Sequence, residues 1–219
     1  MPKHKLVIFD VDGTLLDTTS GVLASIDYTI NALGLPKLSI DEELSFVGPP
    51  VHDSFKKAFD LSEERTLKAV ELFRNSYKDT NLFKASPYDG IYELVRKLKS
   101  RKVKIGVATY KRNDYAISIL KHFKFNDYYD VAYGADPDNK LKKSDLIKKC
   151  IEDLKVSPDE AVMIGDTKLD AIGSEQIGCD FIGVTYGFGF KSKDDVKEYK
   201  NIGAADTIEE LGELLLKNN

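Results

Sequence analysis

The chain has 219 residues, 42% of them hydrophobic, and a formal net charge of −4. This length and apolar content suit one large domain or two small ones with a substantial core. The basic residues are spread along the chain without an arginine-rich stripe, which argues against a nucleic acid polymer as a partner.

We expect neither a membrane segment nor a signal peptide in this chain. No apolar run approaches the roughly 20 residues of a membrane span, and no apolar signal segment precedes Asp10. The two cysteines, Cys150 and Cys179, lie in no CxxC pair and near no histidine at metal-ligand spacing, which favours buried free thiols. We therefore predict a cytoplasmic protein in a reducing compartment, with no membrane partner.

Five short apolar runs have the pattern of buried strands. They are Leu6–Phe9, Val103–Ala108, Asp130–Tyr133, Ala161–Ile164 and Phe181–Val184. Continuous apolar runs, rather than strict alternation, indicate parallel strands that are covered on both faces. Helical patterns lie between them, as in residues 89–102, where the apolar residues form one stripe. The alternation of strand and helix predicts a doubly wound α/β fold with a parallel sheet.

One region, from about Thr18 to Asn81, interrupts this alternation and contains no convincing strand. Glycine- and proline-containing breakers divide it into helical stretches. These stretches are Gly21–Leu33, Asp41–Phe46, Val51–Phe59 and Ser62–Asp79. We therefore predict an all-helical cap, residues 17–84, inserted into an α/β catalytic core that consists of residues 1–16 and 85–219.

Polar residues stand directly after four of the predicted strands. They are Asp10, Asp12, Gly13 and Thr14 after the first, Thr109, Tyr110 and Lys111 after the second, the lysines of residues 140–143 after the third, and Asp166 and Asp170 after the fourth. Ligands of open α/β sheets bind beyond the carboxyl ends of the strands. We therefore expect these four clusters to meet at one edge of the sheet.

The residue types in these clusters suit the transfer of a phosphoryl group. Asp10 and Asp12 share a side because an extended chain has a two-residue period, and with Asp166 they offer the hard oxygen ligands that Mg²⁺ prefers. An ionised aspartate beside a metal can attack phosphorus as a nucleophile. Gly13 lets the backbone present N–H groups to an anion, Thr109 offers a hydroxyl, and a lysine offers a positive charge. Positioning and charge stabilisation are what phosphoryl transfer needs.

The stretches DVDGTLLDT, VATYK, NKLKKSD and GDTKLD together resemble the haloacid dehalogenase (HAD) superfamily. The likeness covers nearly the whole chain and is greatest to the phosphoglycolate phosphatase-like branch, which has a helical cap after the first strand. The resemblance implies a Rossmann-like core and a Mg²⁺-dependent phosphatase that hydrolyses a small phosphorylated metabolite, whether a phosphoglycolate-like ester, a nucleotide or a sugar phosphate. Pyrophosphate also stays open as a substrate. We make no prediction of the oligomeric state.

The resemblance also implies a role for each aspartate. Asp10 would be the nucleophile that forms an aspartyl-phosphate, and Asp12 would be the general acid and then the base that activates water. Asp10, Asp12 and Asp166 would hold the Mg²⁺, with Asp12 contributing its backbone carbonyl. Asp170 would support Asp166 or the phosphate-binding lysine.

Four residues are the candidates for binding the phosphate: Gly13, Thr109, Tyr110 and Lys143. The family lysine stands just before a helix, so we favour Lys143, directly ahead of SDLIKKCIEDL, over Lys142 and Lys140. Tyr110 replaces the small polar residue that is more usual in the family, and its backbone N–H could still serve.

Other interpretations stay open at this point. Asp10 and Asp12 could be turn and helix-capping residues, and Asp170 could be a solvated helix residue. A sugar phosphomutase of the β-phosphoglucomutase type shares both aspartates and the helical cap. A protein of another class, a non-catalytic binder of a phosphate ligand, could use the same scaffold. The presence of Asp12 argues against dehalogenase chemistry.

Overall fold

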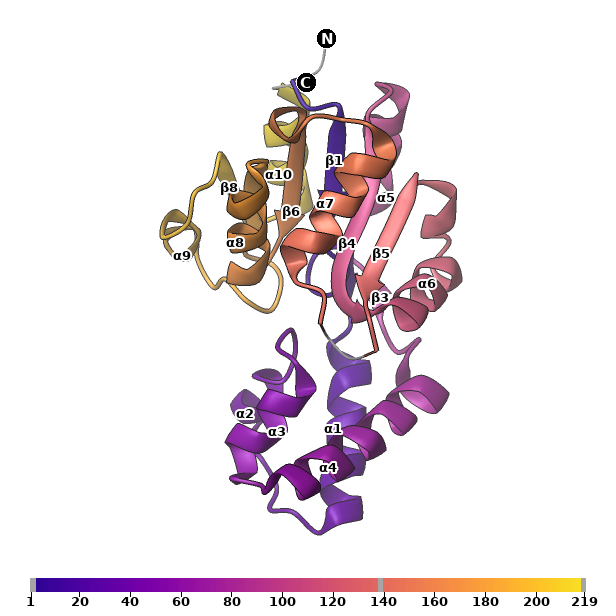
Figure 1. Ribbon diagram of the computed structural model, residues 1–219, viewed down its shortest axis with the longest axis vertical. Helices are drawn as coiled ribbons and strands as arrows, with labels where there is room; N and C mark the ends of the chain where they lie inside the picture. Colours follow the sequence, from indigo (N-terminus) through magenta and orange to yellow (C-terminus); the bar gives the residue numbers. More distant parts are fainter. Residues whose placement is uncertain (1–2, 138–139, 218–219) are drawn as a thin grey trace. The chain divides into compact units, whose positions relative to one another are not determined.

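The computed structural model describes residues 3–137 and 140–217 of the chain (Figure 1). The chain divides into two compact units, Met1–Leu16 with Pro87–Asn219 and Asp17–Ser86. We refer to them as the α/β unit and the helical unit. The sequence placed the second boundary two residues earlier, between residues 84 and 85. Two-residue strands, β2 (Leu16–Asp17) and β3 (Ser86–Pro87), lie where the chain passes from one unit to the other.

A parallel sheet in the order β5-β4-β1-β6-β7-β8 forms the centre of the α/β unit. Its strands are β1 (Leu6–Phe9), β4 (Lys104–Arg112), β5 (Val131–Ala135), β6 (Ala161–Gly165), β7 (Asp180–Val184) and β8 (Gly203–Ala205). In β1, Phe9 lies opposite Val107 of β4 and Ile164 of β6. The residues that follow these three strands are therefore neighbours, because parallel strands end at the same edge.

Helices cover both faces of this sheet, which is why β1 is buried along its whole length. They are α5 (Ile91–Ser100), α6 (Asn113–His122), α7 (Lys143–Leu154), α8 (Lys168–Ile177), α9 (Lys193–Lys197) and α10 (Ile208–Lys217). On one face, α7 and α8 pack together, and Leu146 and Ile147 share a hydrophobic core with Leu6 and Ile8. Helices α5 and α10 contact each other behind the sheet in Figure 1.

The helical unit contains α1 (Thr19–Leu33), α2 (Ile40–Leu44), α3 (Val51–Phe59) and α4 (Glu63–Ser76). Helix α4 continues into a π-helical turn, Tyr77–Asn81. Phe55 is fully buried at the centre of an aromatic core, with its ring 5.0 Å from that of Phe46 and 6.2 Å from that of Phe73. This unit therefore has a hydrophobic core of its own.

These observations confirm the predicted fold class, a doubly wound parallel sheet with helical additions. Several strands differ from their predicted bounds by one or two residues, and β4 differs most, because it was expected to end at Ala108 and continues to Arg112. Its pairing with β5 shifts register between Thr109 and Arg112, so the strand continues past an irregularity of the β-bulge type. The short strand β8 was not predicted, because its three small residues carry no strand pattern. Helix α10 was not predicted either, although its apolar residues follow a helical spacing.

Both cysteines are buried and free, as predicted. Burial raises the pKa of the Cys150 thiol to about 12 and that of the Cys179 thiol to about 11, so neither is a reactive thiolate at neutral pH. Within residues 3–137 and 140–217, no helix has both the length and the apolar character needed to span a bilayer.

Candidate active site

Asp10 follows the last residue of β1 and is 7% exposed. Its Oδ1 accepts a hydrogen bond from the backbone N–H of Val11 at 2.7 Å, and its Oδ2 lies 3.1 Å from Nζ of Lys143. Burial raises the pKa of the Asp10 carboxyl to about 6, which Lys143 opposes and the charge of Asp170 reinforces. The central strand therefore holds a carboxylate in a site where its negative charge is costly without a cation.

Lys143 is the first residue of α7, and its side chain is only 2% exposed. Its Nζ lies 2.7 Å from Oδ1 of Asp170, 3.1 Å from Oδ2 of Asp10 and 3.1 Å from the carbonyl oxygen of Ala108. Burial alone would lower the pKa of this ammonium group, but Asp10 and Asp170 hold the pKa above its ordinary value. Lys143 is therefore a buried cation between two carboxylates.

The structure separates the three lysines that the sequence left as alternatives. Lys140 and Lys142 are exposed, whereas Lys143 is buried in the carboxylate cluster. Tyr110 contributes to this arrangement, since its hydroxyl accepts a hydrogen bond from the backbone N–H of Lys143 at 2.9 Å. Tyr110 thus anchors the start of the helix that carries the buried lysine, a contact that the sequence did not indicate.

Asp166 follows the last residue of β6 and is fully buried. Its Oδ2 accepts hydrogen bonds from the backbone N–H groups of Phe188 at 2.7 Å and Gly189 at 3.0 Å. Its Oδ1 is buried and has no hydrogen-bond partner among the described residues. Burial raises the pKa of the Asp166 carboxyl to about 8, with Asp170 and Asp10 adding to the rise. One oxygen is therefore held by the backbone, while the other is left for a ligand.

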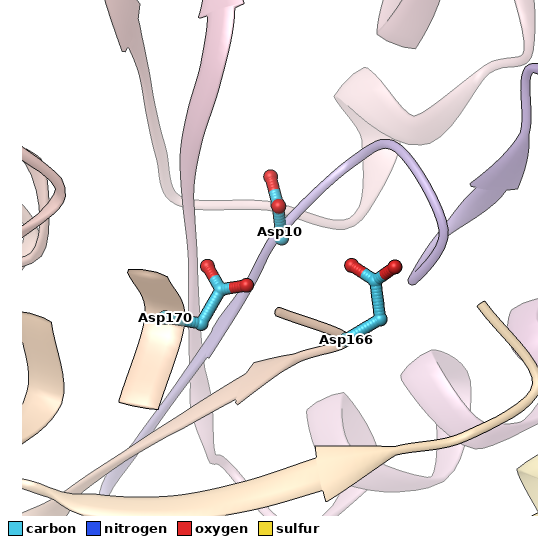
Figure 2. Close-up of side chains that lie close together, drawn as sticks. All are labelled: Asp10, Asp166 and Asp170. Atoms are coloured by element: carbon cyan, nitrogen blue, oxygen red, sulfur yellow. The ribbon is translucent and has the colours of Figure 1, made fainter. Parts of the chain in front are cut away.

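Three carboxylates of this region form one cluster (Figure 2). Asp10, Asp166 and Asp170 each offer an oxygen within 4.8 Å of the others. Together with the unpartnered oxygen of Asp166, this gathering of hard oxygen donors fits a divalent cation such as Mg²⁺. Such an ion would offset the burial and the repulsion that together raise the pKa values of Asp10 and Asp166.

Asp170 has a different set of contacts from the other two carboxylates. It is fully buried, which contradicts the alternative of a solvated helix residue. Its Oδ2 accepts hydrogen bonds from the backbone N–H of Thr167 at 3.1 Å and from the Thr167 hydroxyl at 2.6 Å, while its Oδ1 pairs with Lys143. Both oxygens are engaged, so Asp170 is placed to orient the lysine.

The carboxylate of Asp12 is not part of this cluster. Nζ of Lys111 lies 2.9 Å from Oδ1 and 3.0 Å from Oδ2 of Asp12. The Lys111 side chain is 6% exposed. The sequence placed Lys111 at the end of its strand without giving it a role, and only the structure reveals its partner.

Gly13 has a backbone conformation and surroundings that exclude a side chain. Its φ angle is +76°, in the left-handed region, and a Cβ atom there would lie 2.3 Å from Oδ2 of Asp166. Gly187 makes a similar approach, since its Cβ would lie 2.3 Å from the carbonyl oxygen of Gly13. These two backbone segments therefore pack directly on Asp166.

The loop after β7, residues 185–189, is a further part of the site. It supplies both N–H donors to Asp166, and its Tyr186 hydroxyl donates a hydrogen bond to the carbonyl oxygen of Thr14 at 3.2 Å. Its glycines were the available signal, because close backbone approach requires them. Thr109, in contrast, was predicted: it is buried, and its hydroxyl helps to lower the pKa of Asp10.

The amino-acid sequence is similar to those of known HAD-like hydrolases and of two characterised relatives. The family model described as haloacid dehalogenase-like hydrolase matches residues 7–184. A 5'-nucleotidase of Pseudomonas aeruginosa is 31% identical over 199 residues, which are 90% of this chain and 89% of that protein. The tyrosine-protein kinase PtkA of Mycobacterium tuberculosis is 33% identical over 212 residues, which are 96% of this chain and 72% of that protein.

The fold is also similar to that of solved structures. The crystal structure of a predicted phosphatase from Clostridium acetobutylicum has a TM-score of 0.89 and 34% sequence identity, and the likeness covers 98% of this chain and 99% of that one. This chain therefore belongs to the haloacid dehalogenase-like hydrolase family. These comparisons confirm the predicted family and the predicted class of enzyme, an HAD-type phosphatase.

Proposed function

We propose that this HAD hydrolase is a Mg²⁺-dependent phosphatase that hydrolyses a small phosphate monoester through an aspartyl-phosphate on Asp10. The observation that carries the proposal is the position of Lys143, a buried cation 3.1 Å from Asp10 and 2.7 Å from Asp170. Asp166, whose carboxylate clusters with those of Asp10 and Asp170, has a buried oxygen without a hydrogen-bond partner among the described residues. This pattern of charge suits an anionic group that is held between a lysine and a metal. The nucleotidase name of one relative supports a phosphate ester as substrate.

In the proposed reaction, Oδ2 of Asp10 attacks phosphorus, and the bond from phosphorus to the ester oxygen breaks. Asp12 donates a proton to the departing oxygen, so that the alcohol leaves in its neutral form. Asp12 then takes a proton from a water molecule, whose oxygen attacks the phosphorus of the aspartyl-phosphate. Inorganic phosphate leaves, and the Asp10 carboxylate is regenerated.

Other groups of the chain would bind and neutralise the phosphoryl group. Asp10, Asp166 and the backbone carbonyl of Asp12 would hold Mg²⁺, which supplies positive charge that stabilises the transferring phosphoryl group. Lys143 adds a second positive charge, and its two carboxylate partners fix its ammonium group. The Thr109 hydroxyl and the backbone of Gly13 would contact the phosphoryl oxygens.

Phosphate release from a panel of small esters tests this function directly. We expect the wild-type protein to release inorganic phosphate from some members of the panel with Mg²⁺ and to release none with EDTA, because the repulsion among the carboxylates would then be uncompensated. The panel should include phosphoglycolate, nucleoside monophosphates, sugar phosphates and pyrophosphate. Absence of release from every ester would contradict the proposal. A test for isomerisation of a hexose phosphate with its bisphosphate would then separate a mutase from a non-catalytic binder.

The pKa values predict how metal removal changes the stability of the protein. Without metal, folded Asp166 keeps its proton up to about pH 8, whereas the unfolded chain releases it near the ordinary pKa of 3.8. The folded state thus binds more protons in this window, and the free energy of unfolding falls as pH rises, by up to about 1.4 kcal/mol per pH unit for each such carboxyl. Asp10 adds a change of the same sign between 3.8 and about 6.

Because Mg²⁺ displaces these protons, it should raise the melting temperature more at pH 8 than at pH 5. Thermal unfolding with Mg²⁺ and with EDTA across this range measures the difference. Asp166→Asn is the matched control, since it removes the titrating group and should flatten the dependence on pH. An effect of Mg²⁺ that is equal at both pH values, or larger at pH 5, would show that Asp166 does not bind the ion.

A further inference from the structure

The Lys111 side chain carries a largely covered cation to which the proposed reaction gives no role. Its Nζ lies 2.9 Å and 3.0 Å from the two carboxylate oxygens of Asp12, so it contacts both at once. The Lys111 side chain is 6% exposed and that of Asp12 is 20% exposed, which takes the pair largely out of water. A pair in such surroundings is held more firmly than one on the surface.

The fold of β4 explains how Lys111 reaches this position. The strand continues past Thr109, and its register against β5 shifts between Thr109 and Arg112. Such irregularities redirect side chains at the ends of strands. The Thr109 hydroxyl accepts a hydrogen bond from the Lys111 backbone N–H at 3.2 Å, which fixes the backbone at the redirected residue. The backbone of Lys111 is therefore held in place by a neighbouring residue of its own strand.

Lys143 and Lys111 have different partners. Lys143 pairs with Asp10 and Asp170, inside the carboxylate cluster, whereas Lys111 pairs with Asp12, whose carboxylate is not part of that cluster. Each lysine thus fixes a different aspartate of the proposed reaction. Proton transfer needs its acid within hydrogen-bond reach of the reacting oxygen, and a displacement of about 1 Å can cost on the order of 100-fold in rate.

We propose that Lys111 is a positioning residue that holds the Asp12 carboxyl group in the orientation for proton transfer to the leaving oxygen. This inference rests on the function proposed above. Lys111 acts through Asp12 and forms no bond with the substrate. Its contribution should therefore depend on how strongly the leaving group needs a proton, a dependence that neither a structural role nor phosphate binding would produce.

Leaving groups of different basicity give the test. An alkyl phosphate from the panel needs protonation to leave, whereas p-nitrophenyl phosphate loses a stable phenolate without it. We expect Lys111→Met to lower the single-turnover rate of alcohol release from the alkyl ester by about 10- to 100-fold, which is a partial loss of the roughly 10²- to 10⁴-fold that general acid catalysis contributes. The rate of nitrophenolate release should fall by less than about 3-fold. Single-turnover rates are needed because Asp12 also serves in the later hydrolysis step.

Three further variants make the result specific. Arg112→Met removes the neighbouring positive charge of the same strand, which pairs with Asp114 instead, and should leave the ratio of the two rates unchanged. Lys111→Arg keeps a cation with two donors and should recover part of the alkyl rate. In an Asp12→Asn background, Lys111→Met should have no further effect on the ratio. Circular dichroism and melting temperature establish that each variant is folded.

Two results would overturn the inference while leaving the proposed function intact. An equal loss for both esters would assign Lys111 a structural role, and a rise in KM alone for both esters would make it a phosphate contact. A wild-type protein that releases nothing from either ester would instead refute the proposed function, and this inference with it.

Discussion

Asp10→Asn is expected to lower kcat for phosphate release by at least about 10⁴-fold, because the amide cannot act as the nucleophile that forms the aspartyl-phosphate. The variant should still fold, since its Oδ1 can keep the hydrogen bond from the Val11 N–H. In the wild type, Oδ2 of Asp10 lies 3.1 Å from Nζ of Lys143. In the variant, the new Nδ2 group would face this ammonium group, so a contact between two hydrogen-bond donors would replace the ion pair. Phosphate release at saturating ester and Mg²⁺ measures the effect.

The same exchange outside the cluster serves as the control for Asp10→Asn. Asp159 is exposed in the short 3₁₀ turn before β6, and Asp159→Asn should keep kcat within about 2-fold of the wild-type value. If Asp10→Asn retains more than about a tenth of the wild-type kcat while folded, Asp10 is not the nucleophile. The chemistry would then have to begin from another group.

Lys143→Met is expected to have the largest effect on stability. It leaves the buried Asp10 and Asp170 without their cation, and loss of one partner from a buried ion pair costs about 3–5 kcal/mol. The loss should be greatest at pH 8 and smaller at pH 5, where the Asp10 carboxyl, with its pKa of about 6, takes up a proton instead. Urea unfolding at the two pH values, in EDTA, measures the change in the free energy of unfolding.

Lys142→Met is the matched control for this prediction. Lys142 immediately precedes Lys143 but is exposed, so the same substitution there should change the free energy of unfolding by less than about 0.5 kcal/mol. A Lys143→Met variant as stable as Lys142→Met at pH 8 would mean that the carboxylates do not depend on the lysine. Activity is a second readout, because the variant also loses the proposed phosphate-binding charge.

Local patterns in the sequence predicted the type of most elements. The strand Leu6–Phe9 and the helix Val51–Phe59 were predicted with the bounds that the structure shows. Such patterns suffice because the faces that an element buries are recorded in the spacing of its own apolar residues. The three-residue strand β8 was missed because it has no such spacing.

The carboxyl ends of the predicted strands also led to the candidate site. The sequence alone placed Asp10 and Asp166 at strand ends, and the structure brings their carboxylates together with that of Asp170. Parallel strands make this inference possible, because every strand of such a sheet ends at the same edge. A resemblance to a known family then supplied the roles that geometry cannot assign.

Contacts between distant parts of the chain needed the tertiary structure. The pairing of Lys111 with Asp12 depends on the register of β4, and the burial of Lys143 depends on where α7 begins against the sheet. The N–H donors to Asp166 come from a loop 22 residues farther along the chain. The sequence by itself therefore determined which chemical groups stand at the strand ends. Only the tertiary structure decided which of them touch, because side-chain direction follows from strand register, bulges and helix starts that no local pattern records.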